Sequence, residues 1–216
     1  MVAIVAILAA IAFPVAKSWL GSAAEARALS NLRQIGVVLF NYAADNSNRL
    51  PFVEAAGNKE TGEVYGWFQG NLAVYMGVRF DPKNTYWLPE IFYDPTLRRP
   101  GEHPYGSLGV NRSLILRKSD LPAGSSGTLL SSIQNPSQKV IVSSAADPGL
   151  PNLKGSWYFD GVGFADTGVG GGGWHCYPEP RYGGKAGCLF ADGHVEKLDV
   201  QSMDVATRRR HFTPDR

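Results

Sequence analysis

The sequence predicts an α+β protein in which a long N-terminal helix packs on the antiparallel β-sheet of a globular head. Two observations support this prediction. The first 16 residues carry no charged side chain and lead directly into a stretch with helical periodicity. After residue 52 that periodicity fades, and short apolar runs separated by Gly and Pro follow, which is typical of short strands joined by turns.

We expect one helix from about residue 2 to about residue 45. Behind the apolar first half, apolar residues recur at spacings of three and four with polar residues between them, as in a helix that lies on a core: Leu29, Leu32, Ile35, Leu39 and Tyr42. Pro14 should kink the helix, and Pro51 blocks its continuation. The chain then divides into an apolar helix half (1–20), an amphipathic half (21–48) and a β-rich head (49–216).

The apolar half suits a membrane. Sixteen helical residues reach about 24 Å, and extension through Lys17 and Trp19 to Leu20 approaches the length that crosses a bilayer. A secretory signal peptide would need a basic segment before the apolar stretch, and none is present. Small residues in "AILAAIA" would let such helices pack closely, so filament formation and a plain single-pass anchor are both open. The candidate packing and kink residues are Ile4, Ile7, Leu8, Ala10, Ile11 and Pro14.

The head is predicted to consist of short strands. The candidates are residues 64–68, 72–80, 86–93, 107–116, 138–145, 156–164, 186–191 and 194–200. Residues 205–210 form a short helix or a frayed tail.

The pair Asp192-Gly193 predicts a hairpin over residues 186–200. An Asp-Gly linker between apolar runs is typical of a two-residue type I′ turn, which would pair Ala191 with His194 and Phe190 with Val195. Asp192 would then bind local backbone groups. We therefore expect no catalytic or metal-binding role for Asp192 or His194, and no enzymatic activity.

Composition limits other functions. The net charge of +2 gives no argument for nucleic-acid binding. Cys176 and Cys188 lack the spacing of a zinc site; they could form a disulfide in an oxidising compartment or remain two free thiols. Asp160 and Asp166 lie in the glycine-rich stretch 159–174 and are weak calcium candidates, because the stretch lacks the ligand density of an EF-hand. No other cofactor is expected.

Four segments together resemble the type IV pilin-like and pseudopilin-like proteins of the prepilin-type group with a C-terminal His-x9-Asp-Gly motif. "AIVAILAAIAFP" is similar to the pilin hydrophobic helix, and "ARALSNLRQIGVVLFNYAADNSNRLP" to the helix and exit that follow it. "SIQNPSQKVIVSSAAD" and "RYGGKAGCLFADGHV" resemble two C-terminal segments of the group. The four occur in the order expected for the group, and they are spread over most of the length of the chain, from residue 3 to residue 195.

The chain departs from this pattern at three places. Tyr182 stands at the position of the motif histidine, so the motif reads Tyr-x9-Asp-Gly. Asp94 stands where similar proteins often have a cysteine, so no disulfide is expected there. The basic leader and the first mature residues of a pilin are absent, and we expect Met1 to be an internal methionine of a longer precursor.

The resemblance implies a pilin-like fold and a structural function. The chain would be a subunit of a bacterial type II secretion or type IV pilus-like assembly, polymerising through its N-terminal helix. Its partners would be like subunits, the lipid bilayer and the inner-membrane machinery that assembles filaments for protein transport. It would cross the cytoplasmic membrane once, with the head in the periplasm or outside the cell. The alternative is a membrane-anchored surface module that binds a glycan or protein and does not polymerise.

Overall fold

The computed structural model describes residues 2–55, 66–78, 89–97, 107–116, 126–148, 155–168 and 176–215. Side chains are described from residue 19 on within these ranges, apart from those of residues 20, 54–55 and 66–70. The chain is α+β, with one long helix and a six-stranded sheet.

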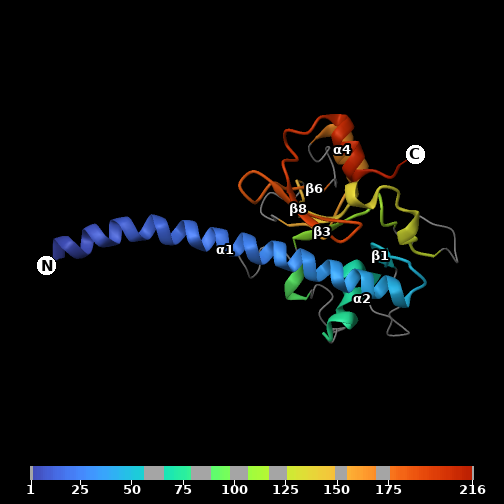
Figure 1. Cartoon of the computed structure of the whole chain (residues 1–216), viewed down its shortest axis with the longest axis horizontal. Coiled ribbons are helices and arrows are strands. Elements are labelled where there is room, and N and C mark those ends of the chain that lie inside the picture. The colour runs from blue at the N-terminus through green and yellow to red at the C-terminus, as the bar shows by residue number, and fades with distance from the viewer. Residues whose placement is uncertain are drawn as a thin grey trace.

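Helix α1 (Val2–Asp45) is a single element of 44 residues, which confirms the predicted extent. Its first half extends away from the head and its second half lies along it (Figure 1). The helix runs through Pro14 without interruption and curves gently in Figure 1. In the part of the chain whose side chains are described, no helix is long and apolar enough to cross a membrane.

The second half of α1 packs on the head through one stripe. Five residues at helical spacing are no more than 1% exposed: Ala28, Leu32, Ile35, Leu39 and Ala43. Gly36 belongs to the same face, because a Cβ added there would lie 3.0 Å from Cδ1 of Leu189. The predicted amphipathic half is therefore confirmed. The helix ends where the Asn48 N–H donates to the Ala43 carbonyl at 2.8 Å, with Asn48 at a positive φ of 61°.

The main sheet has the order β5-β3-β4-β7-β8, and β6 pairs with β4 outside this path. Its strands are β3 (Leu108–Asn111), β4 (Val140–Ala146), β5 (Tyr158–Phe159), β6 (Tyr177–Pro178), β7 (Ala186–Phe190) and β8 (Val195–Leu198). All pairs are antiparallel except β3 with β5, where Val110 lies opposite Tyr158. The sheet is thus mixed, because β5 pairs with the edge of β3 opposite β4 and runs in the direction of β3.

Five of the eight predicted strands are wrong in whole or in part, and three of these lie in the segment 64–93. Residues 72–80 fall in α2 (Phe68–Ala73) and a 3₁₀ turn (Val74–Met76) as far as the described residues reach. Residues 86–93 contain the 3₁₀ turn Glu90–Phe92 after Pro89, and residues 86–88 lie outside the described ranges. Of the prediction at 64–68, residues 64–65 lie outside the described ranges, and Gly66–Trp67 form β2, which pairs with β1 (Glu54–Ala55). Phe68 begins α2.

Of the predicted strand 156–164, only Tyr158–Phe159 form a strand, because the next residue, Asp160, caps a helix. Its carboxylate accepts from the Gly163 N–H at 3.1 Å, and α3 (Gly161–Thr167) follows. The predicted strand 107–116 likewise ends at Asn111 and continues as a turn. The strand predictions at 138–145, 186–191 and 194–200 are confirmed, with ends shifted by one or two residues.

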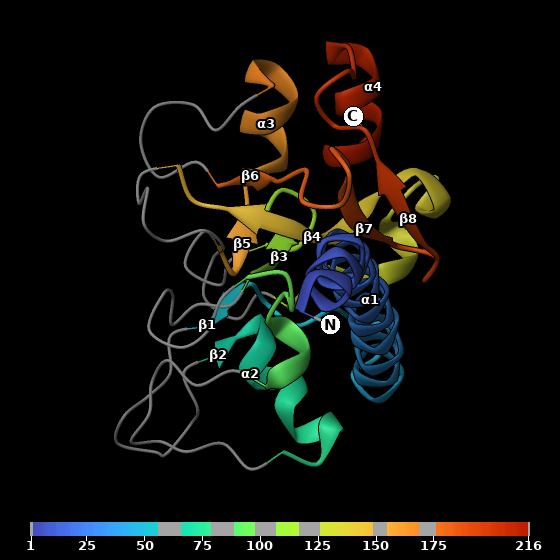
Figure 2. The ribbon, with the colours of Figure 1, turned by 90° about the vertical axis from the view of Figure 1, so that its left-hand side faces the viewer.

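Helices cover both faces of the sheet. Residues 205–210, predicted as a short helix or a frayed tail, belong to helix α4 (Val205–Phe212). Its N-cap Asp204 accepts from the Thr207 N–H at 2.7 Å. Figure 2 shows α3 and α4 on the side of the sheet opposite α1. Each side has its own apolar core: Leu189 of β7 packs in the cluster with α1, whereas Cys188 and Phe190 pack in the cluster with α3 and α4. Phe212 joins α4 to α3 by an edge-on contact with Phe164, at 5.1 Å between ring centroids.

Candidate functional site

The hairpin tip contains three loop residues, not two. The Gly193 N–H donates to the Phe190 carbonyl at 3.0 Å, and the Phe190 N–H donates to the His194 carbonyl at 2.9 Å. Phe190 therefore faces His194, and Leu189 pairs with Val195. Only Gly193 of the loop has a positive φ, 95°. A type I′ turn needs a positive φ at two residues, so the predicted two-residue type I′ turn and its register are wrong.

The hairpin tip lies against α1, and the carboxylate of Asp192 finds its hydrogen-bond partners within the tip itself. A Cβ added at Gly193 would lie 2.8 Å from Cε2 of Phe40 on α1. The Asp192 carboxylate accepts from the His194 N–H at 3.1 Å and lies 2.6 Å from Nδ1 of the His194 ring. Burial opposes ionisation of Asp192, but the hydrogen bonds and charge of His194 outweigh it and lower the pKa of that carboxyl. The His194 ring stacks on Phe190 at 4.1 Å between centroids.

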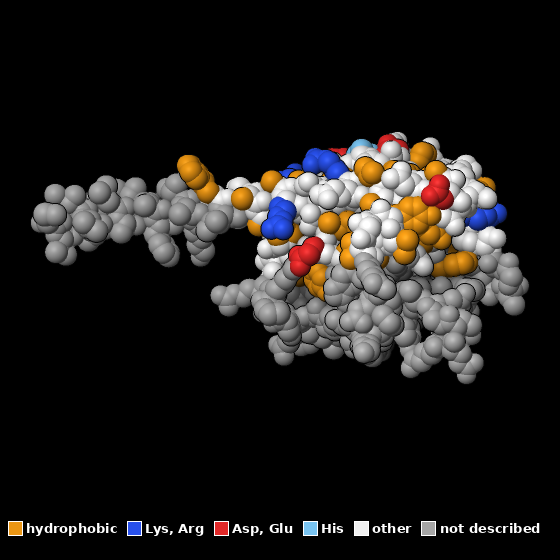
Figure 3. Space-filling view, turned by 90° about the horizontal axis from the view of Figure 1, so that it is seen from below, with side chains coloured by type: hydrophobic (Ala, Val, Ile, Leu, Met, Phe, Trp, Pro, Cys, Tyr) orange, Lys and Arg blue, Asp and Glu red, His pale blue; other side chains and the backbone are white. Residues whose placement is uncertain are grey.

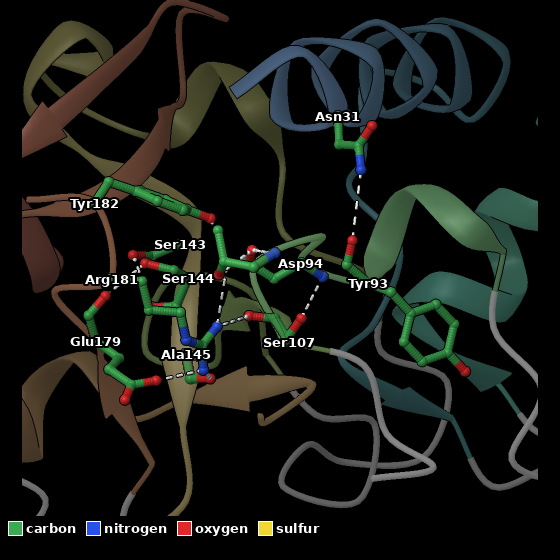
Figure 4. A network of polar contacts seen from close by, with 11 residues as sticks. Asn31, Tyr93, Asp94, Ser107, Ser143, Ser144, Ala145, Glu179, Arg181 and Tyr182 are labelled. Carbon is green, nitrogen blue, oxygen red and sulfur yellow. Dashed lines mark hydrogen bonds and ion pairs between the residues drawn. The ribbon is translucent and has the colours of Figure 1, made fainter. Parts of the chain in front are cut away.

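A second polar cluster, missed by the sequence analysis, lies inside the head around Asp94 (Figure 4). The Asp94 side chain is completely buried. Its Oδ1 accepts from the N–H and the hydroxyl of Thr96, at 2.8 and 2.6 Å. Its Oδ2 accepts from the hydroxyl of Tyr182 at 2.5 Å and lies 3.4 Å from Nη1 of Arg181. A buried carboxylate is thus surrounded by donors, as burial of a charge requires.

Arg181 ties the cluster to the sheet. Its Nη1 donates to the Ser107 carbonyl at 3.0 Å, its Nη2 donates to the Ala145 carbonyl at 2.6 Å, and it forms an ion pair with Glu179. Burial, and secondarily the charge of Asp94, raise the pKa of the Tyr182 hydroxyl, so it stays protonated and acts as a donor. Asp94, Tyr182 and Arg181 are the buried centre of the cluster, which connects the segment 89–97 to strands β3 and β4.

A third missed residue, Lys139, holds the C-terminal segment. Its side chain is 2% exposed, and Nζ donates to the carbonyls of Arg210 and Thr213 at 2.8 and 2.9 Å and to Asp215 at 2.6 Å. A cation at the C-terminal end of α4 satisfies carbonyls that have no partner in the helix. Lys139 therefore fixes α4 to the start of β4.

The calcium candidates do not come together as a site. Asp160 is the N-cap of α3 and forms an ion pair with Arg112 at 2.9 Å. Asp166 lies in the last turn of α3 and pairs with Arg209 at 2.9 Å. Within the glycine-rich stretch 159–174, residues 161–167 form a helix, and each carboxylate faces a cation of the chain. Among the described residues no group of three or more His, Cys, Asp or Glu could hold a metal ion.

The possible disulfide is not formed. Cys176 and Cys188 are both free and buried. Burial raises the pKa of the Cys176 thiol to about 11 and that of the Cys188 thiol to about 12. The Cys188 sulfur lies 3.4 Å from the hydroxyl of Ser143. Both thiols are therefore packed, protonated core groups, since the thiolate is the reactive form.

The predicted packing residues lie in the half of α1 that extends from the head. Ile4, Ile7, Leu8, Ala10, Ile11 and Pro14 belong to the helix, and their side chains lie outside the described part of the structure. Along the described part, Trp19 and Val37 are the most exposed large apolar residues of α1, at 74% and 62%. Figure 3 shows hydrophobic and polar side chains interspersed along this helix.

Comparison with protein-family models, with curated proteins and with solved structures finds no match. The functional argument therefore depends on the geometry of this chain.

Sequence reasoning found the helix and the hairpin but missed the clusters around Asp94 and Lys139. Apart from Thr96, the side-chain partners that these two residues have lie 71 to 88 positions away, so no local pattern connects them. One signal did exist: Asp94 and Tyr182 are two positions at which the chain departs from the pattern it resembles. The structure brings these two departures into direct contact.

Proposed function

We propose that this chain is a pilin-like or pseudopilin-like subunit that polymerises through its N-terminal helix in a type II secretion or type IV pilus-like assembly. The observation that carries the proposal is the form of α1. One continuous helix has its second half packed in the head and its first half extending beyond it (Figure 1). The sequence of the extending half contains only apolar side chains up to Ala16. Such a surface needs lipid or other helices around it.

The head is consistent with a structural function. The side chains of Asp94 and Lys139 are buried and are paired with other groups of the head. The hairpin tip lies close to Phe40 of α1. These contacts hold the helix and the head in a fixed relation. In a filament, a fixed relation would let packing of the helices set the position of every head. In the proposed arrangement the apolar half lies in the cytoplasmic membrane before assembly, and the head lies on its outer side.

Cysteine crosslinking in membranes tests the proposal. Single cysteines are placed at Ile4, Ile7, Leu8, Ala10 and Ile11, and disulfide formation is followed on non-reducing gels. The native thiols give little background, because both are buried. A set of crosslinked dimers that follows one helical face supports polymerisation. The matched control is Ser137→Cys, an exposed position on the head, which should remain largely monomeric. Monomers at all five helix positions would refute the proposal and favour a non-polymerising, membrane-anchored binding module.

A further inference from the structure

We draw no further inference here: the strongest candidate, the outward face of α1 on which the side chains of Trp19 and Val37 are exposed, carries nothing, because nothing in the described part of the structure shows what covers it.

Discussion

The hydroxyl of Tyr182 donates a hydrogen bond to Oδ2 of Asp94, 88 positions earlier in the chain. Tyr182 is one of three residues that donate to this carboxylate, together with Thr96 and Arg181. A carboxylate buried without donors is strongly destabilising, and a buried phenol without an acceptor loses a hydrogen bond. The pair therefore acts as one unit that joins the segment 89–97 to the region before β7.

Tyr182→Phe should destabilise the head by about 1–3 kcal/mol, because it removes a donor from a buried carboxylate. Urea denaturation followed by tryptophan fluorescence measures the loss. Tyr177→Phe is the matched control: Tyr177 is half-buried and makes no side-chain hydrogen bond to the described residues, so less than about 0.5 kcal/mol is expected. Equal effects of the two variants would mean that the bond to Asp94 contributes nothing specific.

Gly193→Val should destabilise the head by about 1 kcal/mol or more. Gly193 has a φ of 95°, which a β-branched residue adopts with strain, and its added Cβ would meet Phe40. Gly183→Val separates the two causes, since Gly183 has a φ of 61° and open space around it. The thermal midpoint of Gly193→Val should fall further than that of Gly183→Val. An unchanged midpoint for Gly193→Val would contradict the turn described for the hairpin.

The hairpin also shows how far the sequence could predict this fold. Asp192-Gly193 correctly indicated a turn between two strands, because that signal is local. The same dipeptide fits two- and three-residue loops, and the choice depends on pairing Phe190 with His194 and on the contact with Phe40. Phe40 lies on α1, far from the hairpin in the sequence, so the local pattern could not supply that contact.

The same distinction explains the other elements. The periodicity of α1 is repeated over many turns and predicted its extent and its buried stripe. Residues 161–167 contain two glycines in the first three positions and gave no helical pattern, yet Asp160 caps a helix there. The packing of Phe164 on Phe212 stabilises that helix through a contact 48 residues away, which outweighs its low intrinsic propensity. Local patterns predicted the long helix and the C-terminal hairpin, whereas the helix at 161–167 depends on long-range contacts that the sequence pattern does not show.

Lys139→Met should destabilise the protein by about 1–3 kcal/mol, because three acceptors at the end of α4 lose a charged donor. Lys185→Met, at an exposed lysine, serves as the control and should change little. Hydrogen exchange would show the loss first in α4, where protection should fall relative to β4. Uniform loss of protection, or none, would contradict the assignment of Lys139 as the residue that fixes α4.

Acid should weaken the same contact. The hydrogen bond from Lys139 lowers the pKa of the Asp215 carboxyl below its ordinary value of 3.8. A group with a lowered folded pKa contributes stability that is complete above the unfolded pKa and is lost as the pH falls through the folded value. Stability should therefore decline below about pH 4. Asp215→Asn should make that decline shallower in pH-dependent urea denaturation, while an identical slope would show that Asp215 takes no part.

The two cysteines should be inert in the folded protein and both reactive once it unfolds. Burial raises the pKa of the thiols to about 11 and about 12, so at pH 8 almost no thiolate forms and access is blocked. Iodoacetamide at pH 8 should leave the native mass unchanged, and in denaturant without reductant it should add two labels. Because these folded pKa values are raised, the thiols contribute stability below the unfolded pKa of about 9 that is lost as the pH rises through the folded values. Cys188→Ser should therefore flatten the alkaline loss of stability. Failure to label the denatured chain without reductant would reveal a disulfide and contradict the packing described for both residues.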